Sequence, residues 1–279
     1  MPVFTQWLQL SPLAWMIGKI RTDFRPELKT PVTEKTMTAK VHPLPPMPLL
    51  ADPPQWNETP LPPWEAIGQS VMGNTINLYR PGKSNVLVMG GVHGDESEGI
   101  FLAHLLMALP GELPVIPCLN PDGALLRQRW NRNNVDLNRN LPTDDWQPEP
   151  LNPRYPPGAA PASEPETQAF LKALESTGAT IVLNLHSYKE SFVEIERAPE
   201  TLAPEVNQAI EGFLGVAKIE RRVSIGYQTP GALGAFGIKN NLLILTYELY
   251  RGMSHGEIEP LAQPLNQMLH TLAAEPFRG

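Results

Sequence analysis

Residues 86–96 read VLVMGGVHGDE, and this stretch indicates both the fold class and the place of a functional site. It begins with a continuous apolar run, Val86 to Val92, which is typical of a strand buried on both faces of a sheet. The run leads directly into His93-Gly94-Asp95-Glu96, so an imidazole and a carboxylate follow the carboxyl end of a buried strand. Because open α/β sheets build their sites at these strand ends, we expect a functional site here.

The rest of the chain alternates between strand and helix patterns. Strands are predicted at 75–80, 115–120, 180–185, 192–196 and 242–249, and helices at 97–109, 164–176, near 203–215 and near 257–274. Strands that alternate with helices indicate a sheet covered by helices on both faces. We therefore expect an α/β fold, and we find no internal repeat.

Proline is unusually frequent, at 32 of 279 residues, and it is concentrated in two stretches. Nine prolines lie between Pro43 and Pro63, and eight lie between Pro142 and Pro165. The first stretch belongs to a segment without sustained periodicity. We therefore expect an N-terminal arm and proline-rich linker at 1–69, packed on a main domain at 70–279.

The composition argues against several classes of protein. The net charge is −7, from 22 basic and 29 acidic residues, whereas a nucleic-acid binder needs a basic surface. No apolar run approaches the roughly 18 residues of a membrane span, and the N-terminus lacks the basic start of a signal peptide. Cys118 is the single cysteine, so no internal disulfide can form. We expect a cytoplasmic protein without a membrane or nucleic-acid partner.

Metal-binding residue types follow three predicted strands. Besides His93 and Glu96, His186 follows the strand at 180–185, and Glu248 lies near the end of the strand at 242–249. Two imidazoles and a carboxylate leave a tetrahedral Zn²⁺ one open position for water, as in catalytic zinc sites. The His-x-x-Glu pair alone is weak, since short spacings recur by chance and a helix start would also explain Glu96. Three strand ends together favour a metal site.

A polar segment between the first two strand ends carries Arg129, Asn138 and Arg139. The planar guanidinium of arginine matches a carboxylate, and asparagine adds a neutral donor beside it. We interpret these three residues as an anion site. The neighbouring Arg127 and Arg132 are interpreted as solvated loop residues.

Six motifs occur in order along the chain: HGDE (93–96), NPDG (120–123), R-x-N (129–131), VDLNRN (135–140), LHSY (185–188) and YEL (247–249). Over roughly residues 70–275 this set resembles the zinc carboxypeptidase family. Within the family it is most similar to the bacterial murein peptide amidases, which cleave the γ-D-glutamyl–diaminopimelate bond of cell-wall peptides. The short spacing from NPDG to DLNRN and the run Ser163–Thr167 carry this closer likeness.

The resemblance implies a single mixed, mostly parallel twisted sheet and one Zn²⁺ per chain. His93, Glu96 and His186 match the zinc ligands of the family. Glu248 matches the general base, later the general acid, of a metal-activated water, and Arg129 matches the arginine that stabilises the oxyanion. The implied reaction is hydrolysis of an amide bond next to a free carboxylate, in peptidoglycan recycling.

Further positions carry the substrate side of the resemblance. Asn138 and Arg139 match the pair that binds the terminal carboxylate of a small peptide substrate. Tyr227 matches a mobile tyrosine that closes over substrate, although a packed loop aromatic explains it equally well. The chain departs from the family pattern at Asn134, where glycine is usual, and at Arg251, which adds a charge after the glutamate motif.

Two other functions stay open. An acylase related to aspartoacylase or succinylglutamate desuccinylase shares the His-x-x-Glu and Asn-Arg pairs, but the His186-Ser-Tyr motif and Asp95 favour the peptidase. A catalytically silent, metal-dependent binding module would lack Glu248 or Arg129, and both are present. The arm at 1–69 could strap the body or mediate an oligomer. The second proline stretch is expected to form a stiff wall of the substrate cleft.

Overall fold

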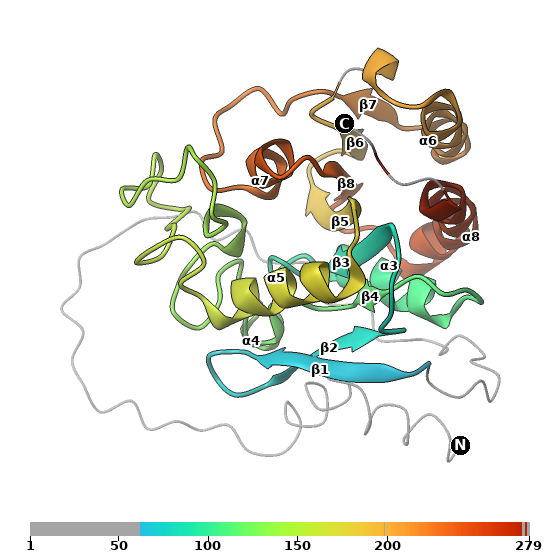
Figure 1. Ribbon diagram of the computed structural model, residues 1–279. Helices are drawn as coiled ribbons and strands as arrows, with labels where there is room; N and C mark the ends of the chain where they lie inside the picture. The colour runs from blue at the N-terminus through green and yellow to red at the C-terminus, as the bar shows by residue number, and fades with distance from the viewer. Residues whose placement is uncertain (1–61, 198, 275–276, 278–279) are drawn as a thin grey trace. The chain divides into compact units, whose positions relative to one another are not determined.

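The computed structural model describes residues 62–197, 199–274 and 277 (Figure 1). The first proline stretch lies almost wholly outside the described residues, so the role of the arm stays a prediction. Residues 64–69, which the sequence grouped with the arm, form the edge strand β1 (Trp64–Gln69). Only Ile67 of this strand is buried, so the apolar periodicity that identifies a strand is missing from its sequence.

The described residues form one sheet, in the order β1-β2-β4-β3-β5-β8-β6-β7. The strands after β1 are β2 (Thr75–Tyr79), β3 (Val86–Gly90), β4 (Val115–Ile116), β5 (Ile181–Tyr188), β6 (Phe192–Glu194), β7 (Glu220–Arg222) and β8 (Leu243–Tyr250). The central strands β4, β3, β5 and β8 are parallel. Antiparallel pairing occurs from β1 through β2 to β4 at one end, and between β8 and β6 at the other. The mixed, mostly parallel sheet is confirmed.

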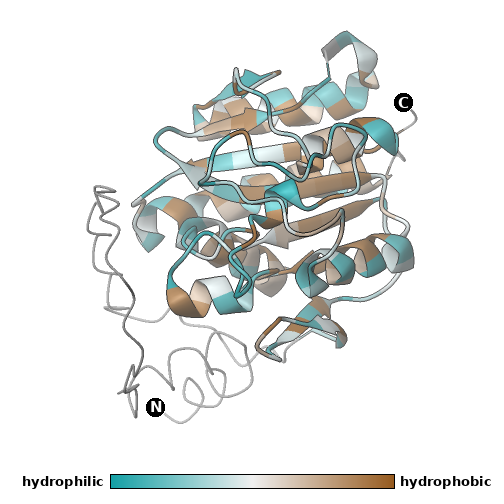
Figure 2. Cartoon of the chain, turned by 90° about the vertical axis from the view of Figure 1, so that its left-hand side faces the viewer, coloured by the Kyte–Doolittle hydropathy of each residue, from teal (hydrophilic) through white to brown (hydrophobic). Residues whose placement is uncertain are grey.

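Helices cover both faces of the sheet. They are α3 (Ser97–Ala108), α4 (Pro121–Leu126), α5 (Pro165–Thr177), α6 (Pro204–Ala217), α7 (Leu233–Lys239) and α8 (His255–Ala274), with 3₁₀ turns η1 (Leu137–Arg139) and η2 (Pro199–Thr201). Helices α3 and α6 pack on α8 over one face, and α5 and α7 share a core with the other (Figure 1). The central strands are mostly hydrophobic, whereas the helices around them combine hydrophobic and hydrophilic residues (Figure 2). No helix among the described residues is long and apolar enough to cross a membrane.

The strands β1 and β7, the helices α4 and α7 and the two 3₁₀ turns were not predicted. Each is short or lies at an edge, so its apolar pattern is weak. A start signal was present for α4, because Asn120 accepts a hydrogen bond from the backbone N–H of Gly123 (2.8 Å) and Pro121 occupies the first turn.

The sheet order places the functional strand ends side by side. β5 lies between β3 and β8, and His186 is in register with Glu248. The loop after β3 packs closely on the start of α4, where a Cβ on Gly94 would lie 1.9 Å from the carbonyl carbon of Gly123. The HGDE and NPDG motifs are therefore in direct backbone contact, which only glycine at position 94 permits.

Candidate metal centre and active site

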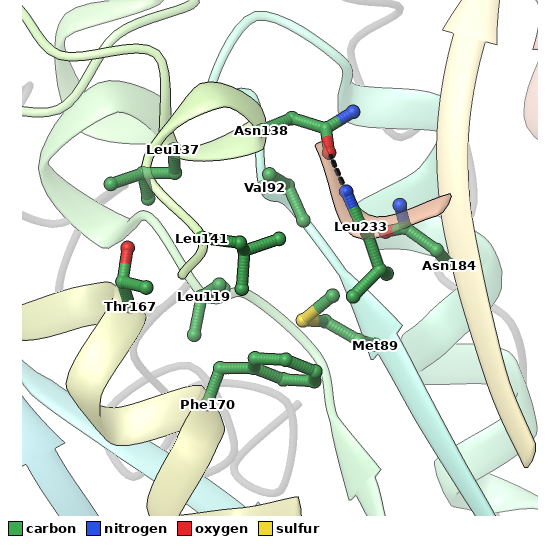
Figure 3. Close-up of a pocket in the computed structure, with 10 residues that line it drawn as sticks. All are labelled: Met89, Val92, Leu119, Leu137, Asn138, Leu141, Thr167, Phe170, Asn184 and Leu233. Atoms are coloured by element: carbon green, nitrogen blue, oxygen red, sulfur yellow. Dashed lines mark hydrogen bonds between the residues drawn. The ribbon is translucent and has the colours of Figure 1, made fainter. Parts of the chain in front are cut away.

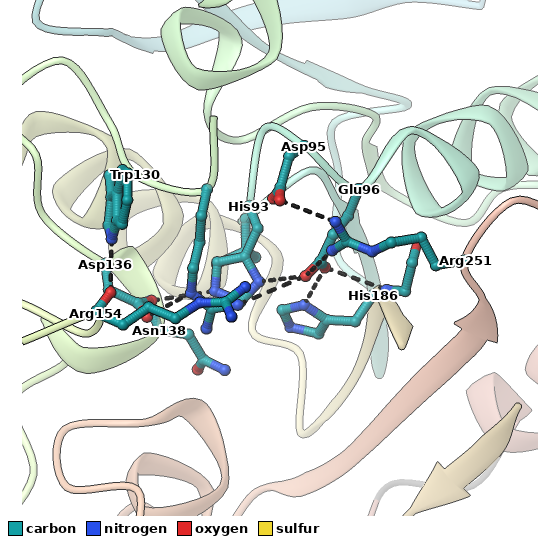
Figure 4. Close-up of polar contacts among 12 residues, drawn as sticks. His93, Asp95, Glu96, Trp130, Asp136, Asn138, Arg154, His186 and Arg251 are labelled. Carbon is teal, nitrogen blue, oxygen red and sulfur yellow. Dashed lines mark hydrogen bonds and ion pairs between the residues drawn. The ribbon is translucent and has the colours of Figure 1, made fainter. Parts of the chain in front are cut away.

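The structure brings the three predicted metal ligands together. Nδ1 of His93 lies 2.9 Å from Oε1 of Glu96, and Nδ1 of His186 lies 2.7 Å from Oε2 of the same carboxylate. Figure 4 shows both imidazoles directed at Glu96. One ligand atom from each residue lies within 4.8 Å of the other two, and all three side chains are buried. This is the arrangement that a single bound cation requires.

The donor set fits a divalent metal. Burial alone would raise the pKa of Glu96, but the flanking imidazoles of His93 and His186 hold it well below its usual range. Glu96 is therefore a carboxylate, the form that binds metals. Two nitrogens and one oxygen are the donors of many catalytic zinc sites, which keep a further position open.

Asp136 supports His93 from the side away from Glu96. Its Oδ1 lies 3.1 Å from Nε2 of His93, and its Oδ2 accepts a hydrogen bond from Nε of Arg129 (2.8 Å). Burial opposes ionisation, but Arg129 and His93 keep the pKa of Asp136 far below its usual range. A carboxylate behind a ligating imidazole fixes the orientation of the ring. The sequence analysis did not single out Asp136, although it lies within the VDLNRN motif.

Asn184 supports the second imidazole. Its Nδ2 lies 2.7 Å from Nε2 of His186, and the side chain is 1% exposed. The backbone N–H of Ser187 also donates to Oε2 of Glu96 (3.2 Å). Neither residue was predicted. The available signal was position, since Asn184 lies two residues before His186 on β5 and points to the same face.

Arg129 lies beside the predicted ligands. Its Nη1 is 3.7 Å from Oε1 of Glu96, and its guanidinium lies 4.9 Å from the centre of the Tyr155 ring. Burial would lower the pKa of Arg129, but Asp136 and Glu96 raise it above its usual value. A permanent cation therefore lies beside the three ligands, where it could stabilise a developing negative charge.

Glu248 is paired with His186 across β5 and β8. Its Oε2 is buried and has no hydrogen-bond partner among the described residues. Burial raises the pKa of Glu248 to about 7, since the repulsion from Glu96 adds to burial while His186 and Arg129 oppose it. A carboxyl whose pKa lies near neutrality can both accept and return a proton.

Asn138 and Arg139 lie on η1 at the edge of the site. Oδ1 of Asn138 accepts from the backbone N–H of Leu233 (2.9 Å), while its Nδ2 has no protein partner within the described residues. The Arg139 guanidinium contacts the carbonyl of Asn138 and lies 5.0 Å from the centre of the Tyr155 ring. Burial lowers the pKa of Arg139, opposed by Asp136. The pair thus offers donors for an anionic group.

The second proline stretch contributes to the same region. Residues 142–164 contain no helix or strand, and Nδ2 of Asn140 holds the loop through the carbonyls of Pro157 (2.8 Å) and Ala160 (3.0 Å). Tyr155 of this loop contacts both Arg129 and Arg139. The second proline stretch thus places Tyr155 against Arg129 and Arg139, which is consistent with the prediction that it forms a wall of the substrate cleft.

The remaining predicted positions also lie near the site. Tyr227 is 50% exposed, and the charges of Tyr155 and Arg139 influence its pKa, which burial raises. Asn134 adopts φ 60°, the left-handed conformation expected where the family has glycine. Arg251 pairs with Oδ2 of Asp95 (2.9 Å) and approaches Oε1 of Glu96 (3.4 Å), so the added charge does reach the centre (Figure 4).

Comparisons with known proteins agree with this geometry. Residues 112–217 match the zinc carboxypeptidase family model. Murein peptide amidase A of Escherichia coli (strain K12) is 31% identical over 202 residues, which cover 66% of this chain and 80% of that protein.

Solved structures of murein-tripeptide amidase and carboxypeptidase are also similar to this chain. Murein-tripeptide amidase MpaA from Escherichia coli O157 has a TM-score of 0.64 and 25% identity, covering 81% of this chain and 98% of that chain. Carboxypeptidase A from Helicoverpa armigera has a TM-score of 0.59 at 16% identity, covers 76% of this chain and 67% of that chain, and shares the fold. The chain therefore belongs to the zinc carboxypeptidase family.

Proposed function

We propose that this hydrolase is a zinc-dependent murein peptide amidase, which cleaves an amide bond of the γ-D-glutamyl–diaminopimelate type next to a free carboxylate. The observation that carries the proposal is the convergence of His93, Glu96 and His186 on one point, with Glu248 on the adjacent strand. The likeness to proteins named murein peptide amidase supports the choice of substrate.

The three ligands would hold one Zn²⁺ per chain. When bound, zinc polarises a carbonyl and lowers the pKa of a water molecule to roughly 7. Oε2 of Glu248, which has no hydrogen-bond partner in the part of the chain that the structure describes, takes a proton from the attacking water and then delivers it to the leaving amine. Arg129 donates to the carbonyl oxygen as negative charge develops on it, while Asp136 holds both the arginine and His93 in place.

The residues of η1 and of the loops beside it bind the substrate. Nδ2 of Asn138 and the guanidinium of Arg139 bind the free carboxylate, which fixes the scissile bond relative to the ligands. Tyr227, half exposed, covers the bound peptide, and Tyr155 lines the wall formed by the second proline stretch. The partner is thus a small peptide with a free carboxylate. We also propose a cytoplasmic location, on the ground of composition alone.

A three-substrate comparison tests the proposal. Zinc-loaded protein is assayed on a γ-D-glutamyl–diaminopimelate peptide, on a peptide with an ordinary C-terminal residue, and on an N-acyl amino acid. We expect the first to have the highest kcat/KM. Faster turnover of the N-acyl amino acid would instead assign the chain to the acylases, and equal rates on all three would contradict the proposed substrate. Glu248→Gln protein serves as the blank for a contaminating hydrolase.

A further inference from the structure

Arg251 is a cation at the active site to which the proposed mechanism gives no role. It follows β8 directly, and its backbone N–H donates to the carbonyl of Tyr188 at the end of β5 (2.7 Å). Nη1 of its guanidinium donates to Oδ2 of Asp95 (2.9 Å), the neighbour of the predicted ligand Glu96. Because both the backbone and the side chain are held, the guanidinium has a defined place beside the metal centre.

The guanidinium of Arg251 keeps donors free for a ligand. It carries N–H groups on Nε, Nη1 and Nη2 and is permanently charged. Nη1 contacts Asp95, and Nη2 lies 3.4 Å from Oε1 of Glu96, whereas Nε has no partner in the part of the chain that the structure describes. The side chain is 30% exposed. The donors that these two contacts leave unused are therefore open to an anion that enters the site.

Arg251 and Asn138, the proposed anchor of the terminal carboxylate, lie on opposite sides of the ligands. On one side, Asp136 contacts Nε2 of His93 (3.1 Å) and accepts from the backbone N–H of Asn138 (3.0 Å). On the other side, Arg251 contacts the carboxylate of Glu96, which faces Nδ1 of the same ring. Figure 4 shows Asn138 and Arg251 at opposite ends of this row. A substrate held by Asn138 therefore crosses the ligands with its acyl part directed toward Arg251.

The acyl part of the proposed substrate carries a group that an ordinary peptide lacks. A glutamyl residue linked through its γ-carboxyl group keeps its α-carboxylate free, separated from the scissile carbonyl by the side-chain methylenes and Cα. The pocket in Figure 3 offers this anion no partner, since its lining is mainly apolar, as at Met89, Val92 and Leu233, and includes no charged side chain. Arg251 supplies a cation of matching geometry on the acyl side of the ligands.

We propose that Arg251 binds the free α-carboxylate of the γ-glutamyl residue and thereby determines specificity on the acyl side of the scissile bond. Asp95 orients the guanidinium for this contact, and the donors that Asp95 leaves unused pair with the carboxylate. The inference rests on the proposed function, because it concerns the substrate of the same site. It adds a second anion site to the one formed by Asn138 and Arg139, which bind the carboxylate of the leaving group.

Two peptides that differ in a single carboxyl group test the inference. One is the γ-D-glutamyl–diaminopimelate peptide, and the other is the same peptide with its glutamyl α-carboxyl group converted to the primary amide. The value of kcat/KM is measured on both with the zinc-loaded full chain, as wild type, Arg251→Met, Arg251→Lys and Lys189→Met. Lys189 provides the matched control, because it is an exposed cation whose Nζ lies 5.5 Å from the centre of the Tyr188 ring.

We expect the wild type to prefer the free acid over the amide by about tenfold, the effect of one hydrogen bond to a charged group. The preference should disappear in Arg251→Met, shrink in Arg251→Lys, which keeps the charge but loses the planar fork, and persist in Lys189→Met. A purely structural role of Arg251 would lower both rates and leave their ratio unchanged, and the ratio is independent of the folded fraction.

Three results would overturn the role of Arg251. The first is an equal kcat/KM for the two peptides in the wild type. The second is a preference for the acid that survives in Arg251→Met. The third is its loss in both Arg251→Met and Lys189→Met, which would mean that the net charge of the surface, and not this guanidinium, selects the substrate.

A binding measurement separates this inference from the proposed function. Zinc-loaded Glu248→Gln protein, with and without Arg251→Met, is titrated with both peptides by isothermal titration calorimetry, which needs no turnover. We expect the acid to bind about tenfold more tightly than the amide only where Arg251 is present. This result without cleavage by the wild type would contradict the proposed reaction and support the carboxylate site. Cleavage of both peptides with equal rates and affinities would do the reverse, and neither binding nor cleavage would contradict both.

Discussion

Two clusters of buried carboxylates in this molecule are stabilised in opposite ways. In the metal centre, Glu96 lies among His93, His186 and Arg129, that is, among imidazoles and a guanidinium. In the second cluster, which we call the turn cluster, Asp122, Glu164 and Glu166 lie beneath the turn between β1 and β2 and are surrounded by neutral donors. Both clusters are almost fully buried.

The turn cluster is complete without a ligand. Asp122 accepts from Oγ of Ser70 (2.5 Å), Nδ2 of Asn74 (2.7 Å) and the backbone N–H of Met72 (2.8 Å). Glu164 and Glu166 share Nδ2 of Asn131. Every carboxylate oxygen of the three residues has a donor, the remaining donors being Asn133, Ser163 and the backbone N–H of Val71. Such satisfied networks stabilise a fold.

The metal centre, by contrast, leaves polar atoms unpaired. Oε2 of Glu248 and Oδ1 of Asn184 are buried without a partner among the described residues. A buried polar atom without a hydrogen bond costs free energy, and these two atoms lie beside the predicted ligands, where a proton or a bound group can pair with them. The comparison therefore predicts that substitutions in one cluster affect function and that substitutions in the other affect stability.

The largest effect is expected from Glu248→Gln. The amide cannot accept the proton of the attacking water, so kcat should fall by about 10²–10⁴-fold, the range of general acid–base catalysis. Zinc stoichiometry, measured by atomic absorption, should stay at the wild-type value because Glu248 is not a ligand. Glu166→Gln in the turn cluster is the control, and its kcat per folded molecule should be unchanged. Unchanged turnover in Glu248→Gln would refute the assigned base.

The next largest effect is expected from removing the metal, which should lower the Tm through the metal centre and not through the turn cluster. Zinc at 100–1,000 times its Kd stabilises the wild type by about 2.7–4.1 kcal/mol through mass action, so its Tm should rise on zinc addition. His186→Ala removes one ligand, and this rise should be lost. A variant of the turn cluster should keep the full rise from its own lower baseline. A zinc-dependent rise in His186→Ala equal to that of the wild type would show that the ligand set is wrong.

A smaller effect is expected from Asp122→Ala, which leaves the donors of Ser70, Asn74 and Met72 without an acceptor. The free energy of unfolding should fall by about 1–3 kcal/mol, the cost of unsatisfied buried groups, as measured by urea denaturation. Zinc affinity and kcat per folded molecule should not change. Asp122→Asn, which retains one acceptor oxygen, should cost less. A loss of zinc binding in either variant would mean that the two clusters are coupled.

The sequence predicted the metal centre better than the turn cluster, for a physical reason. His93, His186 and Glu248 each follow or end an apolar strand, and the neighbouring positions of β3, β5 and β8 bring them together. Asp122 instead depends on donors about fifty residues earlier, in a turn whose strand β1 has no apolar pattern. Nothing local in the sequence indicates such a pairing.

The groups behind the ligands were missed for a related reason. The roles of Asp136 and Asn184 depend on which ring nitrogen each one faces, and this is a property of the assembled site. Their spacing in the sequence carries no such information. The family motifs include Asp136 by position, whereas the sequence places Asn184 only on the same strand face as His186 and does not show their contact.

Glu196 represents a third kind of carboxyl group, which is half-buried. Neither a cation nor a hydrogen-bond donor of the described residues pairs with it. Its carboxylate lies against Gly234, where a Cβ would be 2.4 Å away, and no hydrogen-bond donor of the described residues reaches it. Burial, together with repulsion from Glu194 and Asp145, raises its pKa to about 7. The folded state thus favours the protonated carboxyl.

The smallest effect is expected from Glu196→Gln, which should change how the free energy of unfolding depends on pH. The pKa of Glu196 rises from 4.5 to about 7 on folding, so its contribution to stability is complete below pH 4.5 and is lost as the pH rises through about 7. Glu196→Gln cannot ionise, and its free energy of unfolding should decline less than that of the wild type over this interval. Urea denaturation across the pH range measures the difference, with the exposed Glu205→Gln on α6 as the control. Parallel profiles for Glu196→Gln and the wild type would mean that Glu196 is ionised in the folded protein, and that a donor or cation compensates it as in the other two clusters.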